Sequence, residues 1–138
     1  MGDVSIIARH DLNVAGLEDR LYEFNAAAIG CRDGEDLGFV AEADGQVIGA
    51  AAGYSWAGMA EVRQLWVAEG HRGGGLGSSL MRAAIDEARA RRCRLMFVNT
   101  HSFQAPGFYA RLGFDTVAVI PDKPPGHAEH VLRLDLAR

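Results

Sequence analysis

Apolar residues recur along the chain with two periods, and each change of period marks an expected element. In residues 14–30 they fall three or four positions apart, at Val14, Leu17, Leu21 and Phe24. This spacing predicts an amphipathic helix that Gly30 ends. Residues 76–92 repeat the helical period over a longer stretch, and residues 104–114 predict a short helix closed by Gly113.

The remaining apolar runs are short or alternate with polar residues, which is typical of β-strands. Strands are expected in residues 5–12, 59–67, 94–100, 115–120 and 130–136, and on both sides of a hairpin turn at Asp44-Gly45 within residues 37–56. The strand, helix, strand order around residues 76–92 predicts one parallel crossover. We therefore expect an α/β fold with a mixed, twisted sheet of six to seven strands and helices on both faces.

Composition narrows the class of protein. The chain has 138 residues, which favours a single domain over residues 1–138. No basic and apolar leader opens the sequence, and no apolar run approaches a membrane span, so we expect a cytoplasmic protein with no membrane partner. A net charge of −4 argues against a nucleic-acid partner. Cys31 and Cys93 are too few for a disulfide framework and are interpreted as reduced thiols.

The stretch "HRGGGLGSSL", residues 71–80, places four glycines between an expected strand and a helix. Free N–H groups at a helix start, approached without Cβ atoms, form a physical site for a phosphate. A P-loop is excluded because no Gly-Lys-Ser/Thr follows, and Leu80 stands where a dinucleotide fingerprint needs its third glycine. The pattern that fits is Arg72-x-x-Gly75-x-Gly77, with a merely flexible loop as the alternative.

Two segments together resemble a known family. "LWVAEGHRGGGLGSSLM" resembles the acetyl-CoA motif of the GNAT superfamily of N-acetyltransferases, and "SFQAPGFYARLGF" resembles that family's C-terminal helix. The second segment, with the later "PPGH", is also similar to a bacterial histone-acetyltransferase-like subgroup. The resemblance implies a single N-acetyltransferase domain, an acetyl-CoA cleft between the fourth and fifth expected strands, and a homodimer.

The resemblance also implies which residues hold acetyl-CoA. Backbone amides of the glycine stretch would bind the pyrophosphate, and the strand before it would bind the pantetheine arm as a neighbouring strand does. Ser102 stands where the family often has Asn, and Gln104 is a partial replacement. The expected cofactor-binding residues are Leu65, Trp66, Val67, Arg72, Gly73, Gly74, Gly75, Leu76, Gly77, Ser78, Gln104, Phe108 and Tyr109.

Catalysis is expected from two residues. Tyr109 matches the family's general-acid tyrosine, and the alternative is a core aromatic with its hydroxyl at the edge. Glu61 stands where some members have a general base, and the alternative is an exposed glutamate paired with Arg63. Strict strand alternation predicts that Glu61 shares a face with Arg63, Leu65 and Val67.

The acceptor side is the least defined. Tyr54, Trp56 and His127 are candidate substrate-binding residues, although aromatics at such positions are more often core. The histidines lack a third ligand at metal-binding spacing, so no metal is expected. The function expected is acetyl transfer from acetyl-CoA to a primary amine by direct attack in a ternary complex. The alternative is a non-catalytic acyl-CoA sensor of the same fold.

Overall fold

The computed structural model describes residues 2–137 in two compact units, which divide between Arg32 and Asp33. The first unit holds a 3-10 turn, Val14–Gly16, and helix α1, Leu17–Ile29. Helix α1 ends where Gly30 adopts a left-handed φ of 69° and donates its N–H to the Ala26 carbonyl. Glycine reaches this conformation without steric cost, so the predicted helix and its stop are confirmed.

The strand predicted in residues 5–12 is wrong. The structure assigns no regular element to residues 2–11, and Ile6 is 97% exposed. A strand needs a backbone partner on at least one side. The strands that the structure assigns begin at Glu35.

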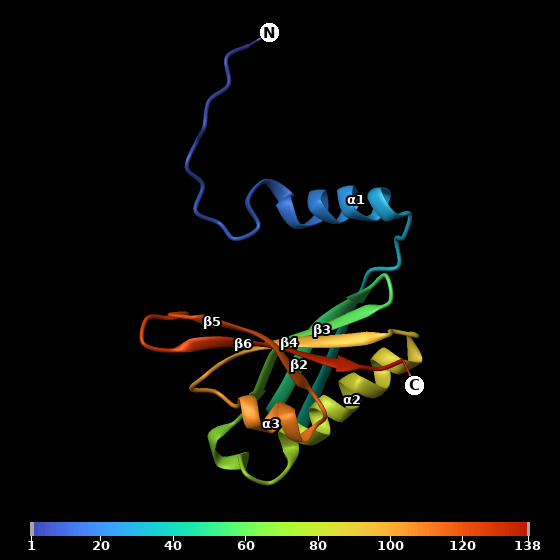
Figure 1. Ribbon diagram of the computed structural model, residues 1–138, viewed down its shortest axis with the longest axis vertical. Helices are drawn as coiled ribbons and strands as arrows, with labels where there is room; N and C mark the ends of the chain where they lie inside the picture. The colour runs from blue at the N-terminus through green and yellow to red at the C-terminus, as the bar shows by residue number, and fades with distance from the viewer. Residues whose placement is uncertain (1, 138) are drawn as a thin grey trace. The chain divides into compact units, whose positions relative to one another are not determined.

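The second unit is built on one mixed sheet of six strands (Figure 1). The strands lie in the order β1-β2-β3-β4-β6-β5, and only β3 and β4 run parallel. The mixed α/β sheet and its single parallel crossover are therefore confirmed. The strand bounds are β1 Glu35–Ala43, β2 Gln46–Trp56, β3 Met59–Val67, β4 Leu95–His101, β5 Asp115–Pro121 and β6 Ala128–Asp135.

The β1–β2 turn is the one that the dipeptide Asp44-Gly45 predicts. Both residues have positive φ, 52° and 77°, as a two-residue hairpin turn with the twist of the strands requires. Ala43 pairs with Gln46 directly across the turn. This hairpin and β3 form the antiparallel half of the sheet.

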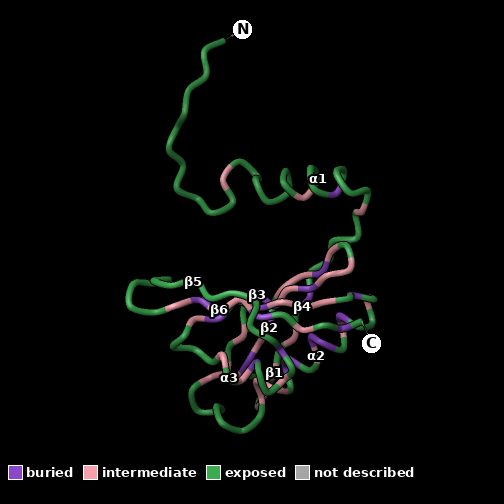
Figure 2. The backbone as a smooth tube through the Cα atoms, in the orientation of Figure 1, coloured by how far each residue is buried: buried purple, intermediate pink, exposed green. Residues whose placement is uncertain are grey.

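Two helices pack with this sheet, α2 at Leu76–Ala90 and α3 at Pro106–Arg111. Figures 1 and 2 show both below the sheet, with the buried positions of α2 turned toward the strands. The core joins α2, the inner face of the strands and the aromatic side chain of Tyr109 from α3. Its largest fully buried side chains are Met81, Met96 and Val98. None of the helices in residues 2–137 combines the length and apolar character that crossing a membrane requires.

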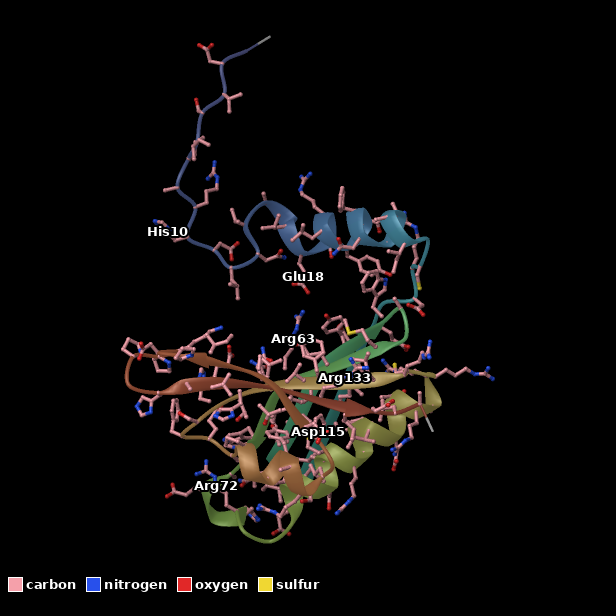
Figure 3. The ribbon with its side chains drawn as sticks, viewed as in Figure 1. His10, Glu18, Arg63, Arg72, Asp115 and Arg133 are labelled. Atoms are coloured by element: carbon pink, nitrogen blue, oxygen red, sulfur yellow. The ribbon has the colours of Figure 1, made fainter. Side chains whose placement is uncertain are left out.

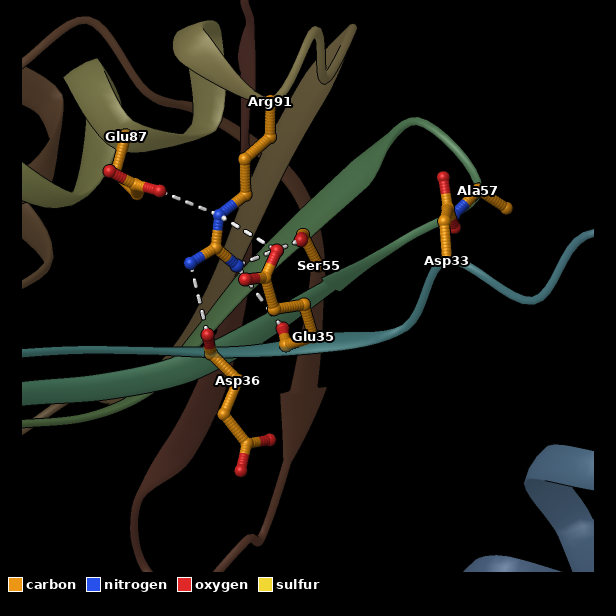
Figure 4. A network of polar contacts seen from close by, with 7 residues as sticks. All are labelled: Asp33, Glu35, Asp36, Ser55, Ala57, Glu87 and Arg91. Atoms are coloured by element: carbon orange, nitrogen blue, oxygen red, sulfur yellow. Dashed lines mark hydrogen bonds and ion pairs between the residues drawn. The ribbon is translucent and has the colours of Figure 1, made fainter.

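Arg91 ties the end of α2 to the first hairpin (Figure 4). Its Nε donates to Glu87 Oε2 at 2.8 Å, one helical turn away. Its Nη atoms donate to Ser55 Oγ at 3.1 Å and to the carbonyl oxygens of Glu35 and Asp36 at 3.2 and 3.0 Å. The Arg91 side chain is only 18% exposed, and its contacts with Glu87 and Ser55 are partly buried. Together the contacts hold α2 in one orientation against the sheet.

Candidate active site

The sheet opens between its two parallel strands. Strands β3 and β4 pair over three positions only, from Met59–Leu95 to Glu61–Phe97. Beyond Glu61, β3 stays with β2 as far as Val67, and β4 stays with β6 as far as His101. The two strands therefore diverge, and their facing backbone edges are free to bind a ligand.

A β-bulge in β3 lies at the start of this opening. Gln64 pairs with Ala52 and Val62 pairs with the next residue, Gly53, so Arg63 is the extra residue. A Cβ atom at Gly53 would lie 1.8 Å from the carbonyl oxygen of Glu61. Only glycine fits opposite the bulge, which explains a glycine inside an otherwise regular strand.

The bulge overturns the predicted alternation of β3. Val62 is buried, and Leu65 and Val67 pack against the same core, although strict alternation assigns Val62 to the other face. The extra residue shifts the phase by one position, because side chains alternate with a period of two. Glu61 therefore does not share a face with Leu65 and Val67.

Two cavities follow the opening and meet. We call them the strand cavity, of about 500 Å³, and the loop cavity, of about 460 Å³. Leu65, Ala105 and Phe108 line both, so they form one continuous groove. The strand cavity is lined by Glu61, Val62, Arg63, Gln64, Leu65, Asn99, Thr100, His101, Gln104, Ala105, Phe108, Tyr109 and Glu129. The loop cavity adds Val67, His71, Arg72, Gly73, Gly75, Gly77, Ser78 and Arg111.

The loop cavity lies at the start of α2. Gly73 and Gly75 take left-handed φ values of 82° and 85°, and Gly75 caps the helix without a side-chain hydrogen bond. The first amides of α2 are therefore not consumed by a capping side chain. Together with the positive end of the helix dipole they suit an anion, as the glycine pattern predicts.

The side chain of Arg72 lines the loop cavity. Its Nε donates to the carbonyl oxygen of Val67 at 2.9 Å, so it ties the glycine stretch back to the end of β3 (Figure 3). Arg111 from α3 and His71 line the loop cavity, and the sequence patterns did not single them out. The proximity of Arg111 to the glycines could not be read from spacing, because Arg111 lies 34 residues beyond Gly77.

Tyr109 reaches the strand cavity from α3. It is 8% exposed, and its ring makes edge-to-face contacts with Phe108 and Phe114 at centroid distances of 5.0 and 5.7 Å. Burial raises the pKa of the Tyr109 hydroxyl above its ordinary value of 10.0. The hydroxyl therefore keeps its proton at neutral pH and can donate a hydrogen bond. Tyr109 is therefore a core aromatic that also lines the strand cavity, and its role as a general acid stays a prediction.

Glu61 is paired with Arg63 but is not exposed, and its role as a general base stays a prediction. Its carboxylate lies 3.6 Å from Arg63 Nε, and its side chain lines the strand cavity at 15% exposure. The Arg63 guanidinium lies 4.5 Å from the ring centroid of Tyr54, and Figure 3 shows Arg63 on the face of the sheet opposite α2. Burial, and then the charge of Glu61, raise the pKa of Tyr54. Tyr54 thus supports the cavity wall without lining it.

Gln104 lines the strand cavity, and its role as a partial replacement for Asn stays a prediction. The backbone N–H of His101 donates to Gln104 Oε1 at 2.7 Å, so the amide group is held at the end of β4. Ser102 instead accepts from the Ala128 N–H at 3.0 Å. The strand cavity also contains Asn99 and Glu129, which sequence reasoning missed because only the pairing of β4 with β6 brings them there.

Six predicted residues lie outside the linings of both cavities: Tyr54, Trp56, Trp66, Gly74, Leu76 and His127. The side chain of Trp66 is turned away from the core and half exposed, and Trp56 lies at the end of β2. His127 contacts the ring of Phe103 edge to face at 5.0 Å, beside the His101 that does line the strand cavity. Direct roles for all six stay predictions.

The groove, the glycine-capped helix and the buried tyrosine define the class of protein as an acetyltransferase. The Acetyltransferase (GNAT) family matches residues 5–114. The chain is 45% identical over 95 residues to blasticidin-S acetyltransferase of Streptomyces morookaense, covering 67% of this chain and 68% of that one. It is 40% identical over 87 residues to streptothricin acetyltransferase of Streptomyces lavendulae, covering 59% of this chain and 46% of that one.

A crystal structure of an acetyltransferase from Bacillus cereus superposes on the whole fold. Its TM-score is 0.82 at 26% sequence identity, and it covers 96% of this chain and 98% of that chain. The chain therefore belongs to the acetyltransferase (GNAT) family. It is an acetyl-CoA-dependent acetyltransferase, and the fold predicted from the sequence is confirmed.

Proposed function

We propose that the chain transfers an acetyl group from acetyl-CoA to a primary amine of a small molecule by direct attack in a ternary complex. The observation that carries this proposal is the continuous groove. It connects an anion site at the start of α2 with a buried tyrosine and a carboxylate in the opening of the sheet. The two ends suit the phosphates and the reacting end of one extended molecule.

The glycine stretch and the open edge of β3 would hold acetyl-CoA. Amides of Gly75, Leu76, Gly77 and Ser78 would bind the pyrophosphate, and the backbone of Leu65 to Val67 would bind the pantetheine arm. A Cβ atom at Gly74 would meet no protein atom within 4 Å, so packing inside the protein does not require glycine there. Close approach of a ligand to the backbone is consistent with a glycine at this position. Acetyl-CoA supplies an acetyl group activated as a thioester.

Two groups of the chain then act on protons: one removes a proton from the acceptor, and the other donates a hydrogen bond to the leaving sulfur. The acceptor ammonium, with a pKa of about 10.4 in water, must lose a proton before it attacks. The Glu61 carboxylate accepts this proton, directly or through a water molecule, while the neutral Tyr109 hydroxyl donates a hydrogen bond to the departing sulfur. A nitrogen–carbon bond forms as the carbon–sulfur bond breaks.

The acceptor is proposed to be an antibiotic amine or a similar small polyfunctional amine. Two relatives are named for acetylating blasticidin S and streptothricin, which supports this class. A homodimer, the histone-acetyltransferase-like subgroup and a cytoplasmic location belong to the same proposal. The first two derive from the family resemblance alone, and the third derives from the composition of the chain.

Thiol release from acetyl-CoA across a panel of antibiotic, polyamine and amino-acid amines tests the proposal. We expect turnover with at least one small amine and none when Tyr109→Phe and Glu61→Gln are combined. A protein that binds CoA tightly yet turns over no amine would instead be the non-catalytic sensor. A stable acetylated cysteine at Cys93 or Cys31 in mass spectra would overturn direct attack.

A further inference from the structure

A buried carboxylate in the strand cavity is paired with the only lysine of the chain. Glu129 is 9% exposed and lines the strand cavity, and Lys123 Nζ lies 2.7 Å from its Oε2. The side chain of Lys123, by contrast, is 55% exposed. A carboxylate so far from water requires a cation beside it, so this position in the cavity is selective for positive charge.

The Lys123 ammonium can move away from the Glu129 carboxylate without a movement of the main chain at Lys123. Lys123 lies in the connection between β5 and β6, where its carbonyl oxygen is 3.1 Å from His101 Nδ1 at the end of β4. This contact fixes the main chain, whereas the four-carbon stem of lysine rotates freely in solvent. The pair joins a buried carboxylate to a half-exposed ammonium that water also solvates, so another ammonium can replace that of Lys123.

Glu129 is distant from the carboxylate assigned to the reacting amine. Glu61 pairs with Phe97 on β4, whereas Glu129 pairs with His101 from the other side. Two strand spacings of about 4.8 Å and four residues of about 3.3 Å along β4 separate their α-carbons by about 16 Å. One amino group cannot contact both carboxylates.

We propose that Glu129 binds a second ammonium group of the acceptor, and that the Lys123 side chain occupies this position in the free protein. The acceptor class is then a primary amine that carries another alkylammonium further along its chain. Binding exchanges one primary ammonium for another, so Glu129 stays paired throughout. The inference rests on the proposed function and specifies the acceptor of the same site.

A matched pair of acceptors tests it: a linear ten-carbon diamine, and the amino alcohol of equal length with a hydroxyl in place of the second ammonium. Their KM and kcat are measured by thiol release. We expect the wild type to show a lower KM for the diamine. Lys123→Met should lower that KM about five-fold, because it removes the competing ammonium, with less than a two-fold change for the amino alcohol. Lys123→Arg should retain the wild-type difference.

Glu129→Gln should raise the diamine KM to that of the amino alcohol, and the double variant Lys123→Met/Glu129→Gln should behave as Glu129→Gln does. The double variant also covers the case in which Lys123→Met leaves Glu129 unpaired and unfolds the protein. Arg82→Met, on the exposed side of α2, is the matched loss of a cation elsewhere. Equal effects of Lys123→Met on both acceptors, or a diamine preference that survives Glu129→Gln, would overturn the inference.

Calorimetric titration of the diamine into CoA-saturated protein separates this inference from the proposed function. No acetyl group is present, so the titration reports binding alone. Tighter diamine binding in Lys123→Met supports the role of Glu129 even if no amine is turned over. Turnover of the diamine with the same affinity in the wild type, Lys123→Met and Glu129→Gln supports the function and rejects the role of Glu129.

Discussion

Replacement of Gly77 by valine tests whether α2 begins at the pyrophosphate site. Gly77 lies in helical backbone, so valine adds no strain of the kind expected at Gly73 or Gly75. A Cβ atom there would lie 3.5 Å from Phe108 Cζ and 3.8 Å from Val67 Cγ2, which are ordinary contacts. The two γ-methyl groups of valine must then enter the loop cavity, because Phe108 and Val67 are its walls.

The expected loss follows from the hydrogen bonds that the methyl groups displace. A hydrogen bond between an amide and a charged phosphate contributes about 1.5–3 kcal/mol, so losing one weakens CoA binding about ten- to a hundred-fold. Calorimetric titration with CoA gives the Kd, and thermal unfolding checks the fold.

Gly70→Val is the matched control, since a Cβ at Gly70 meets nothing within 4 Å and Gly70 lies outside both cavity linings. A folded Gly77→Val protein that binds CoA within two-fold of the wild type would refute the placement of the pyrophosphate.

The remaining predictions concern Tyr109 and Arg91. Tyr109→Phe should lower kcat about a hundred-fold or more while changing CoA affinity little, as measured by thiol release and calorimetry, and an equal kcat would remove the hydroxyl from the chemistry. Burial raises the pKa of Tyr109, so above about pH 10 the unfolded chain loses this proton while the folded protein keeps it. The free energy of unfolding should therefore fall as the pH rises past about 10. The fall should be smaller in Tyr109→Phe. Arg91→Met should lower the free energy of unfolding by about 2–4 kcal/mol in denaturant titrations. Arg89→Met is the control, because Arg89 Nη1 lies 3.9 Å from Asp86 Oδ1 on the exposed surface; it should change the free energy of unfolding by less than about 0.5 kcal/mol. Equal effects of the two substitutions would contradict the role of Arg91 in holding α2 to the first hairpin.

The sequence predicted those parts of the molecule that depend on neighbours along the chain. Apolar spacing located α1 and α2, Asp44-Gly45 located the hairpin, and the glycine spacing located the start of α2. Each of these depends on a local conformation, such as a left-handed residue or a helical face, which a short stretch encodes by itself.

The parts that the sequence did not predict depend on contacts between distant segments. The bulge at Arg63 arises because Gly53 on another strand lets the carbonyl of Glu61 approach. The alternation of side chains along one strand contains no information about such a contact with another strand. A glycine inside an apolar strand was the available signal. Glu129 enters the cavity only because β6 inserts between β4 and β5, an order that element succession does not specify.

The short parallel contact between β3 and β4 also has a consequence for the protein without its cofactor. Past Glu61, two rows of backbone amides and carbonyls face each other unpaired in the middle of the sheet. Open edges of this kind are usually found at the rim, where they promote association between chains. Here the cofactor is expected to act as a removable strand. Amide hydrogen exchange in Gln64 to Val67 should therefore slow on CoA binding far more than in β1, and the empty protein should aggregate more readily than the loaded one.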